Sequence, residues 1–231
     1  MAVIRLDGDE RRKAIVRAAV PLFARKGFAG TTTRELAEAA GISEALLFRH
    51  FPSKQLLYRE ILRLGCEGDP ALEKLAALQP STATLVCMTR FMVRRFVLGS
   101  EGERAELDSR MRLVLHSFLE DGDYAHQLFE TIAERVVPLF EASLAAAIAA
   151  GDVKPALPRG GGDAPANRFW FAQHVAAMMA FAALPGRECI PYRGGLDGIV
   201  EAASSFILRG IGMTDAAIAA GAERAARSAA D

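Results

Sequence analysis

Hydrophobic side chains recur at helical spacing near the start of the chain. Four of them fall at positions i, i+4, i+7 and i+8, on one face of a helix. They are Ile15, Ala19, Leu22 and Phe23. We therefore expect a helix over roughly Asp9–Lys26, followed by Gly27 at a position where helix ends favour a left-handed residue.

Two short helices are expected next, joined by a turn of about four residues that contains Gly41. Thr32 and Glu35 stand at the spacing of a capping box, in which a hydroxyl and a carboxylate satisfy free amides at the start of a helix. Ser43 is placed to cap a second short helix, Glu44–His50. Two short helices around a glycine-containing turn are typical of a helix-turn-helix.

Longer helices follow, with weaker break signals between them. The fourth helix is expected over Ser53–Leu64, after the chain is broken by Pro52. No strand pattern is evident. The remaining helices are expected near Ala71–Leu78, Thr82–Leu98, Glu103–Leu119, Tyr124–Ala150, Pro165–Leu184 and Leu196–Gly210, with a polar tail helix from about Asp215.

Composition indicates a protein that folds without metals or disulfides. The chain has 231 residues, 51% of them hydrophobic, which is enough for a substantial core. The cysteines, Cys66, Cys87 and Cys189, are odd in number and far apart, and they share no metal-ligand spacing with histidine. No secretory signal or run of about 18 apolar residues is present, so we expect a cytoplasmic protein without cofactor, metal or membrane span.

The net charge of zero conceals an asymmetry. Residues 1–63 carry 12 Lys and Arg against 7 Asp and Glu, a net charge of +5, and residues 64–231 carry −5. A basic first third favours contact with a polyanion. Chance clustering of solvated surface charge stays open as an equal alternative on this observation alone.

Three motifs carry a resemblance to a known family. They are Thr-Thr-Arg-Glu-Leu-Ala at 32–37, Ala-Gly-Ile-Ser at 40–43 and Leu-Phe-Arg-His-Phe-Pro-Ser-Lys at 47–54. Over about residues 10–62, without gaps, the chain resembles the N-terminal domain of the TetR (tetracycline-repressor) family. The resemblance implies an all-α fold: a three-helix helix-turn-helix DNA-binding domain over 1–64, followed by a larger helical ligand-binding and dimerisation domain over 65–231.

The second short helix of such a motif lies in the major groove, with its N-terminal residues at the base edges. The candidate DNA-binding residues are Thr33, Arg34, Glu44, Ala45, Leu46, Phe48, Arg49, His50 and Lys54. Ala45 and Leu46 suit a thymine methyl group, and Glu44 suits a cytosine amino group. Glu44 has an alternative role as a carboxylate that stabilises the helix N-terminus.

The remaining candidates are expected to contact the DNA backbone rather than the bases. Hydroxyls and cations such as Thr33, Arg34, His50 and Lys54 suit phosphate contacts. By resemblance, Thr33, Phe48, His50 and Lys54 fall on positions that the family uses for the DNA backbone. Phe48 stands where the family often has Tyr, so a hydroxyl contact to phosphate is lost. Arg49 suits either guanine or phosphate, and packing against the bundle core is the alternative role for His50.

The C-terminal body carries apolar stripes that suit a small-molecule pocket between helices. Candidate ligand-binding residues are Phe91, Met111, Leu115, Phe118, Phe129, Trp170 and His174. Ordinary core packing is the alternative for every one of them. Small residues on the last two long helices permit close helix approach, and by resemblance this pair forms a four-helix bundle in a homodimer.

These patterns lead to one expected function and two rivals. We expect a one-component regulator, and by resemblance a repressor, that binds palindromic operator DNA as a dimer and is released by a small, largely apolar effector. An enzyme is not expected: Gly160-Gly161-Gly162 lacks the following Lys-Ser/Thr of a phosphate loop, and no nucleophile or metal-ligand spacing occurs. A DNA-binding architectural or protein-interaction factor without a small-molecule switch stays open.

Overall fold

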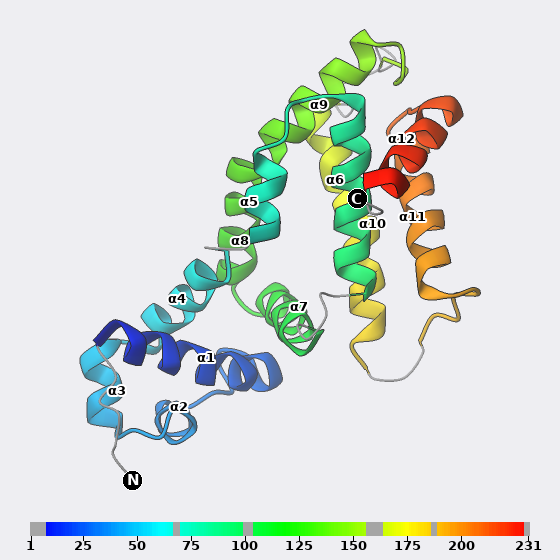
Figure 1. Ribbon diagram of the computed structural model, residues 1–231. Helices are drawn as coiled ribbons and strands as arrows, with labels where there is room; N and C mark the ends of the chain where they lie inside the picture. Colours follow the sequence, from blue (N-terminus) through cyan, green and yellow to red (C-terminus); the bar gives the residue numbers. More distant parts are fainter. Residues whose placement is uncertain (1–7, 67–69, 99–103, 156–163, 186–188, 229–231) are drawn as a thin grey trace. The chain divides into compact units, whose positions relative to one another are not determined.

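The computed structural model describes residues 8–66, 70–98, 104–155, 164–185 and 189–228, and within them the chain forms helices and no strand (Figure 1). The chain divides into two compact units, Met1–Asp69 with Ala105–Thr131, and Pro70–Arg104 with Ile132–Asp231. This grouping does not coincide with a division at residue 64, because α7 and most of α8 join the N-terminal helices. The assignment of DNA binding and ligand binding to 1–64 and 65–231 stays a prediction.

The N-terminal unit holds the expected short helices. Its elements are α1 (Gly8–Lys26), α2 (Thr33–Ala39), α3 (Glu44–His50), α4 (Lys54–Cys66), α7 (Arg104–Leu119) and the greater part of α8 (Asp123–Arg135). The α1 helix packs on α2 and α4, and α2 packs on α3. Phe23, Leu47 and Phe51 are almost fully buried between these helices. The apolar stripe expected on the first helix therefore faces this core.

The second unit is built around one central helix. It contains α5 (Pro70–Ala76), α6 (Thr82–Leu98), α9 (Val137–Ala149), α10 (Pro165–Ala183), α11 (Leu196–Gly210) and α12 (Asp215–Ser228). The α6 helix contacts α9, α10, α11 and α12, and Figure 1 shows it beside α10. Leu85 on α6, Phe140 on α9 and Phe169 on α10 belong to the largest apolar cluster of this unit.

One predicted helix is wrong in its extent. The segment Tyr124–Ala150 forms two helices rather than one, because the chain breaks at Val136 and α9 starts with a proline in its first turn. Pro138 has no amide hydrogen, and its ring clashes with a preceding carbonyl in a continuous helix. The helices predicted at Thr82–Leu98 and Leu196–Gly210 are confirmed with the same bounds.

The loop predicted at Gly160-Gly161-Gly162 lies outside the described residues. None of the helices in the described ranges is long and apolar enough to cross a bilayer.

Candidate nucleic-acid interface

The start of α2 is fixed by the capping box that the sequence predicts. The Glu35 amide donates to Thr32 Oγ1 at 3.3 Å, and the Thr32 amide donates to Glu35 Oε2 at 3.0 Å. The ammonium of Lys26, at the end of α1, also pairs with the Glu35 carboxylate. That hydrogen bond, with those from Thr32, lowers the pKa of Glu35 to about 2. The end of α1 and the start of α2 are therefore joined by one carboxylate.

The turn between α2 and α3 is set by local hydrogen bonds. Gly41 has a φ of 65°, a left-handed conformation that costs glycine little. The Ile42 amide donates to the Ala37 carbonyl at 3.0 Å. Ser43 then caps α3, because its hydroxyl accepts from the Leu46 amide at 3.2 Å. Both ends of the turn are thus tied to the helices that they join.

The end of α3 is held by a cation from α1. Arg12 Nη1 donates to the His50 carbonyl at 2.8 Å, and the Arg12 guanidinium lies 4.2 Å from the centre of the Phe51 ring. Arg12 Nε also pairs with Glu60 Oε1 on α4 at 3.1 Å. Glu60 receives a further hydrogen bond from Arg63 at 2.8 Å. The bond from Arg63, followed by that from Arg12, lowers the pKa of Glu60 to about 2, despite its burial. This network joins α1, α3 and α4.

With both ends fixed, α3 presents one side to solvent. Glu44, Ala45, Phe48 and Arg49 are exposed and share one side of the helix, whereas Leu46 and His50 are half-buried and Leu47 points into the core. The Thr33 hydroxyl donates to Glu44 Oε2 at 2.9 Å, which joins the start of α2 to the start of α3. The exposed side, named here the α3 face, consists of Glu44, Ala45, Phe48 and Arg49.

The predicted phosphate contacts differ in how their charges are used. Arg34 is exposed and pairs with Glu38 on the same helix at 2.9 Å, and such exposed pairs exchange easily with other partners. Lys54 faces inward: its ammonium donates to the Phe28 and Thr31 carbonyls at 2.7 and 2.8 Å and lies 4.2 Å from the centre of the Phe28 ring. Two of its three donors therefore hold the loop before α2.

A second set of contacts joins the helix-turn-helix to the start of α8. The rings of Phe23, Phe28, Tyr58 and Tyr124 form a chain of contacts with centroids 4.9 to 6.1 Å apart. Tyr58 is buried and its hydroxyl has no hydrogen-bond partner among the described residues. Burial raises the pKa of this phenol far above its ordinary value.

Gly27 lies against the end of α7. Its φ of 70° confirms the left-handed residue expected there, and a side-chain Cβ would come within 2.3 Å of Glu120 Oε1. Glu120 Oε2 also accepts a hydrogen bond from the Phe28 amide at 3.3 Å. A larger residue at 27 would have to displace the Glu120 carboxylate, and the positive φ would strain its backbone.

The seven predicted ligand-binding residues divide between the two units. Within the N-terminal unit, Phe118 and Phe129 stack with ring centroids 5.9 Å apart, Met111 is buried and Leu115 is partly exposed. In the second unit, Phe91 and Trp170 pack against the same apolar cluster, and His174 is exposed on α10. A pocket formed by these residues stays a prediction.

Sequence reasoning missed the residues that hold α3 in place. Arg12 and Glu60 are 48 positions apart, and Phe28 contacts Glu120 across 92 positions. No local spacing reveals such pairs.

The described residues also contain no group of three or more His, Cys, Asp or Glu placed to hold a metal ion.

The helices of the N-terminal domain match known proteins in sequence. The family model "Bacterial regulatory proteins, tetR family" matches residues 15–61. The regulator RutR of Escherichia coli K12 is 45% identical over 53 residues, which are 23% of this chain and 25% of that protein. The repressor KstR2 of Rhodococcus jostii RHA1 is 45% identical over 53 residues, 23% of this chain and 26% of that protein. The chain thus aligns with about a quarter of the length of the curated relatives it matches.

Solved structures resemble the chain over most of its length. A putative fatty acid metabolism regulator of Clostridium perfringens covers 87% of this chain and all of its own, with a TM-score of 0.64 and 17% identity. A tetR-family regulatory protein from Rhodococcus RHA1 covers 89% of this chain and 99% of its own, with a TM-score of 0.64 and 18% identity. At such identities the likeness concerns the fold. Residues 15–61 thus form a domain of the kind found in bacterial regulatory proteins of the tetR family.

Proposed function

We propose that this protein is a transcriptional repressor that binds palindromic operator DNA as a homodimer and is released by a small, largely apolar ligand. The observation that carries the proposal is the α3 face. It belongs to the domain that matches the family, and hydrogen bonds fix the helix at its start and at its end. A rigid, exposed and partly cationic helix suits insertion into the major groove of double-stranded DNA. Such a regulator acts in the cytoplasm, where the DNA lies.

Within the α3 face, each side chain suits a different contact. Ala45 lets the backbone approach the bases, and Arg49 suits a guanine edge or a phosphate. Glu44 suits a cytosine amino group but already accepts from Thr33, so the two side chains are expected to move together. Phe48 is 44% exposed and has no hydroxyl, so we propose an apolar contact to sugar.

The anchoring residues surround that face. Arg34 is exposed for a phosphate, and Thr33, Leu46 and His50 lie half-buried beside it. Lys54 keeps one ammonium hydrogen beyond those bound to the Phe28 and Thr31 carbonyls. We propose that Lys54 acts mainly by holding the loop and only secondarily on phosphate.

Dimerisation is supported by an exposed apolar surface on α10 and α11, named here the α10–α11 face. Phe171, Val175 and Met178 recur along one side of α10, and Phe206 lies on α11; they are 62, 37, 55 and 67% exposed. Large apolar side chains that are exposed on two helices of one unit suit an interaction surface. A second copy is the partner we propose, because operators with two-fold symmetry match two-fold proteins.

The switch is proposed on narrower support. The structural neighbour AibR was solved with isovaleryl coenzyme A and operator DNA, and the neighbour FadR of Bacillus subtilis with stearoyl-CoA. In this chain, Ser143 Oγ and Gln173 Oε1 are buried in the second unit without a hydrogen-bond partner among the described residues. We propose that the effector is an acyl compound. A panel of acyl-CoA thioesters should raise the melting temperature with concentration if one of them binds.

Selection of bound DNA from a random pool tests the proposal. The wild-type protein should enrich a palindrome whose half-sites lie about one helical turn apart. An Arg49→Ala variant should lose that enrichment or change the preferred base. An Arg25→Ala variant on α1, with an exposed arginine outside the α3 face, is the matched control. Enrichment of no sequence by the wild-type protein would contradict operator recognition and favour an architectural or protein-interaction role.

A further inference from the structure

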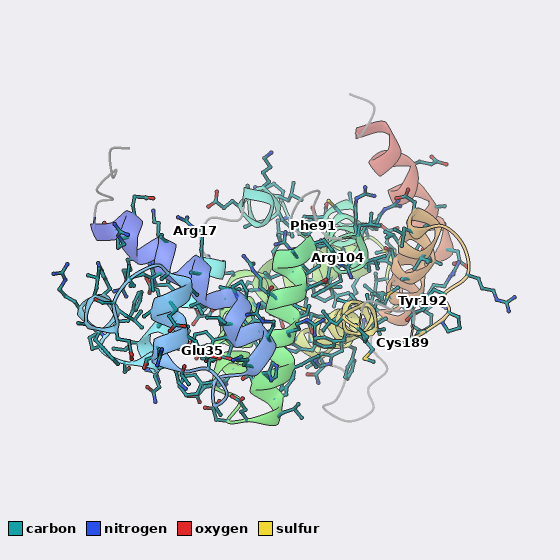
Figure 2. The ribbon with its side chains drawn as sticks, turned by 90° about the horizontal axis from the view of Figure 1, so that it is seen from below. Arg17, Glu35, Phe91, Arg104, Cys189 and Tyr192 are labelled. Carbon is teal, nitrogen blue, oxygen red and sulfur yellow. The ribbon has the colours of Figure 1, made fainter. Side chains whose placement is uncertain are left out.

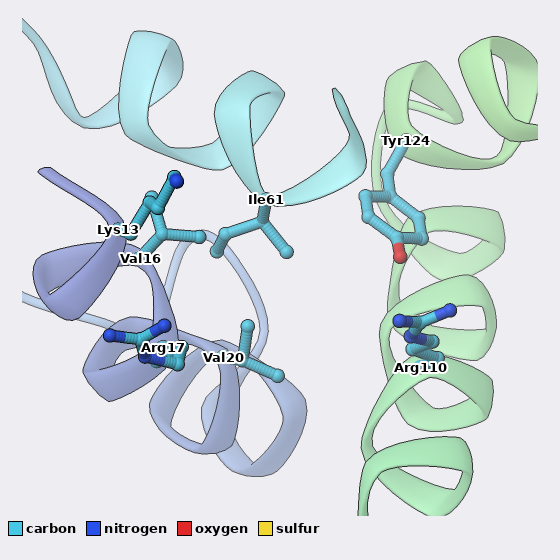
Figure 3. Close-up of a pocket in the computed structure, with 7 residues that line it drawn as sticks. All are labelled: Lys13, Val16, Arg17, Val20, Ile61, Arg110 and Tyr124. Atoms are coloured by element: carbon cyan, nitrogen blue, oxygen red, sulfur yellow. The ribbon is translucent and has the colours of Figure 1, made fainter. Parts of the chain in front are cut away.

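Several polar side chains that line a hollow or a helix end already have partners. In the N-terminal unit, a pocket of about 260 Å³ is lined by residues of α1, α4, α7 and α8, among them Arg110 and Tyr124, and both of these make contacts of their own (Figure 3). Glu35, labelled in Figure 2, accepts hydrogen bonds at the start of α2. His174 on α10 differs, because it forms no hydrogen bond or ion pair with any other residue that the structure describes.

His174 lies among the residues of the α10–α11 face. It is exposed, and Phe171 and Met178 stand three positions before it and four positions after it on the same helix. Side chains at these spacings are neighbours on a helix surface. Val175, the next residue along the chain, is also partly exposed. The imidazole is therefore a titratable group among the large apolar side chains that a second copy covers in the proposed dimer.

The helices packed against α10 carry charges of both signs. They are α6, α9 and α11, and their charged side chains are Arg90, Arg94, Arg95, Glu141, Asp197, Glu201 and Arg209. Arg90 pairs with Glu201 at 2.6 Å and Arg94 with Asp197 at 3.3 Å, so both carboxylates of α11 are engaged by α6. On α10 itself, Arg168 donates to the Ile211 carbonyl at 3.0 Å. In the described part of the chain, a protonated His174 thus has no carboxylate partner.

We propose that His174 makes association through the α10–α11 face depend on pH, so that two copies separate when the imidazoles are protonated. Histidine changes its charge between about pH 5 and pH 8. A second copy that covers the face takes His174 out of water, and burying an imidazolium without a counter-ion costs far more free energy than burying the neutral ring. Two-fold symmetry places both His174 side chains in the same interface, so that this cost is met twice. The inference rests on the dimer of the proposed function and adds the condition under which that dimer forms.

The direction and size of the effect follow from the protons that a dimer must release. Above about pH 7.5 most imidazoles are neutral, and association releases few protons. An exposed histidine is about nine-tenths charged at about pH 5.5, so each dimer releases about two protons when it forms there. The dimer dissociation constant should therefore rise by about 10- to 100-fold between about pH 8 and about pH 5.5.

Sedimentation velocity of the full-length protein, at constant ionic strength, measures the dissociation constant at both pH values. The expected result is a dimer at about pH 8 that weakens by at least about tenfold at about pH 5.5. A dissociation constant that stays the same, or falls on acidification, would overturn the role of His174 and leave the dimer of the proposed function intact. A protein that is monomeric at both pH values would instead contradict the proposed dimer, and the inference with it.

Matched variants assign the effect to this side chain. His174→Gln and His174→Leu carry no charge at either pH, so both should dimerise with a dissociation constant that changes by less than about threefold. His126→Gln replaces an exposed histidine on α8 in the other unit and should keep the wild-type response. Circular dichroism checks that each variant is folded. The inference is refuted by a folded variant at 174 that still weakens about tenfold on acidification, or by failure of both folded variants at 174 to dimerise at about pH 8.

Discussion

The α3 face and the α10–α11 face are both exposed, but they differ in their side-chain chemistry and in the contacts that hold their helices in place. The α3 face carries two charged residues on a helix of seven residues, held by a serine cap at one end and by Arg12 at the other. The α10–α11 face carries four large apolar side chains on helices of 19 and 15 residues, whose N-terminal caps make no side-chain hydrogen bond. A short helix needs such ties because its own backbone hydrogen bonds scarcely stabilise it.

The difference indicates how each face meets its partner. Charged side chains keep their hydration until a polyanion displaces it, so the DNA contact that we propose for the α3 face should depend on salt. Exposed Phe and Met gain free energy whenever water leaves them, about 25 cal/mol per Å² of apolar surface. The α10–α11 face therefore suits a lasting contact, and the α3 face suits one that a ligand can switch.

The largest effect is expected from a charge on the α10–α11 face. Phe206→Glu should raise the dimer dissociation constant by about 100-fold or more, because two-fold symmetry buries the new carboxylate twice. Sedimentation velocity gives that constant directly. Leu119→Glu, at an exposed leucine outside this face, is the control and should leave the dimer intact. A Phe206→Glu protein that dimerises as the wild type does would move the interface elsewhere.

A smaller effect is expected from the network behind α3. The pKa of Glu60 is about 2 in the folded protein and 4.5 in the unfolded chain. The ionised carboxylate therefore stabilises the fold fully above about pH 4.5, and this stability is lost as the pH falls from about 4.5 toward 2. Because both arginines are partly exposed, we expect Glu60→Gln to cost about 2 kcal/mol at pH 7. Urea unfolding at pH 7 and pH 3 measures it.

The control for Glu60 is another carboxylate in an arginine pair. Glu38→Gln removes an exposed pair with Arg34 and should cost at most about 0.5 kcal/mol. The gap between the two variants should shrink at pH 3. Equal costs at pH 7 would mean that the Arg12–Glu60–Arg63 network does not support α3.

The last effect concerns base recognition by the α3 face. Arg49→Ala should change the preferred base at one symmetric pair of operator positions, at a cost of about 1–3 kcal/mol if the arginine contacts guanine with two hydrogen bonds. Fluorescence anisotropy on operators with single base changes measures this. A uniform loss over all sequences would assign Arg49 to phosphate instead.

The comparison of the two faces also explains what the sequence predicted. The capping box at Thr32 and Glu35 and the cap at Ser43 could be read directly, because they join residues only three positions apart. The break at Val136 was missed because apolar periodicity continues across Pro138. Local hydrogen bonds leave a signature in spacing, whereas contacts across the fold do not.

The inward position of Lys54 shows the same limit. Its neighbours in sequence favour an exposed phosphate contact at the start of α4, yet its ammonium bonds two carbonyls more than 20 positions away. The hydrogen bond from the Phe28 amide to Glu120 likewise joins residues 92 positions apart, so no sequence motif predicts it. Both depend on how helices pack, which periodicity alone does not determine.

The central claim is that the basic N-terminal domain binds DNA through its phosphates and that α3 determines which DNA sequence is bound. The most direct measurement is the affinity of the wild-type protein for its selected operator and for random DNA over a series of salt concentrations. The affinity for both should fall steeply, with a log–log slope of about −0.9 per neutralised phosphate. The operator should keep an advantage of at least about 1,000-fold. An affinity that does not change with salt, or one equal for operator and random DNA, would contradict the account.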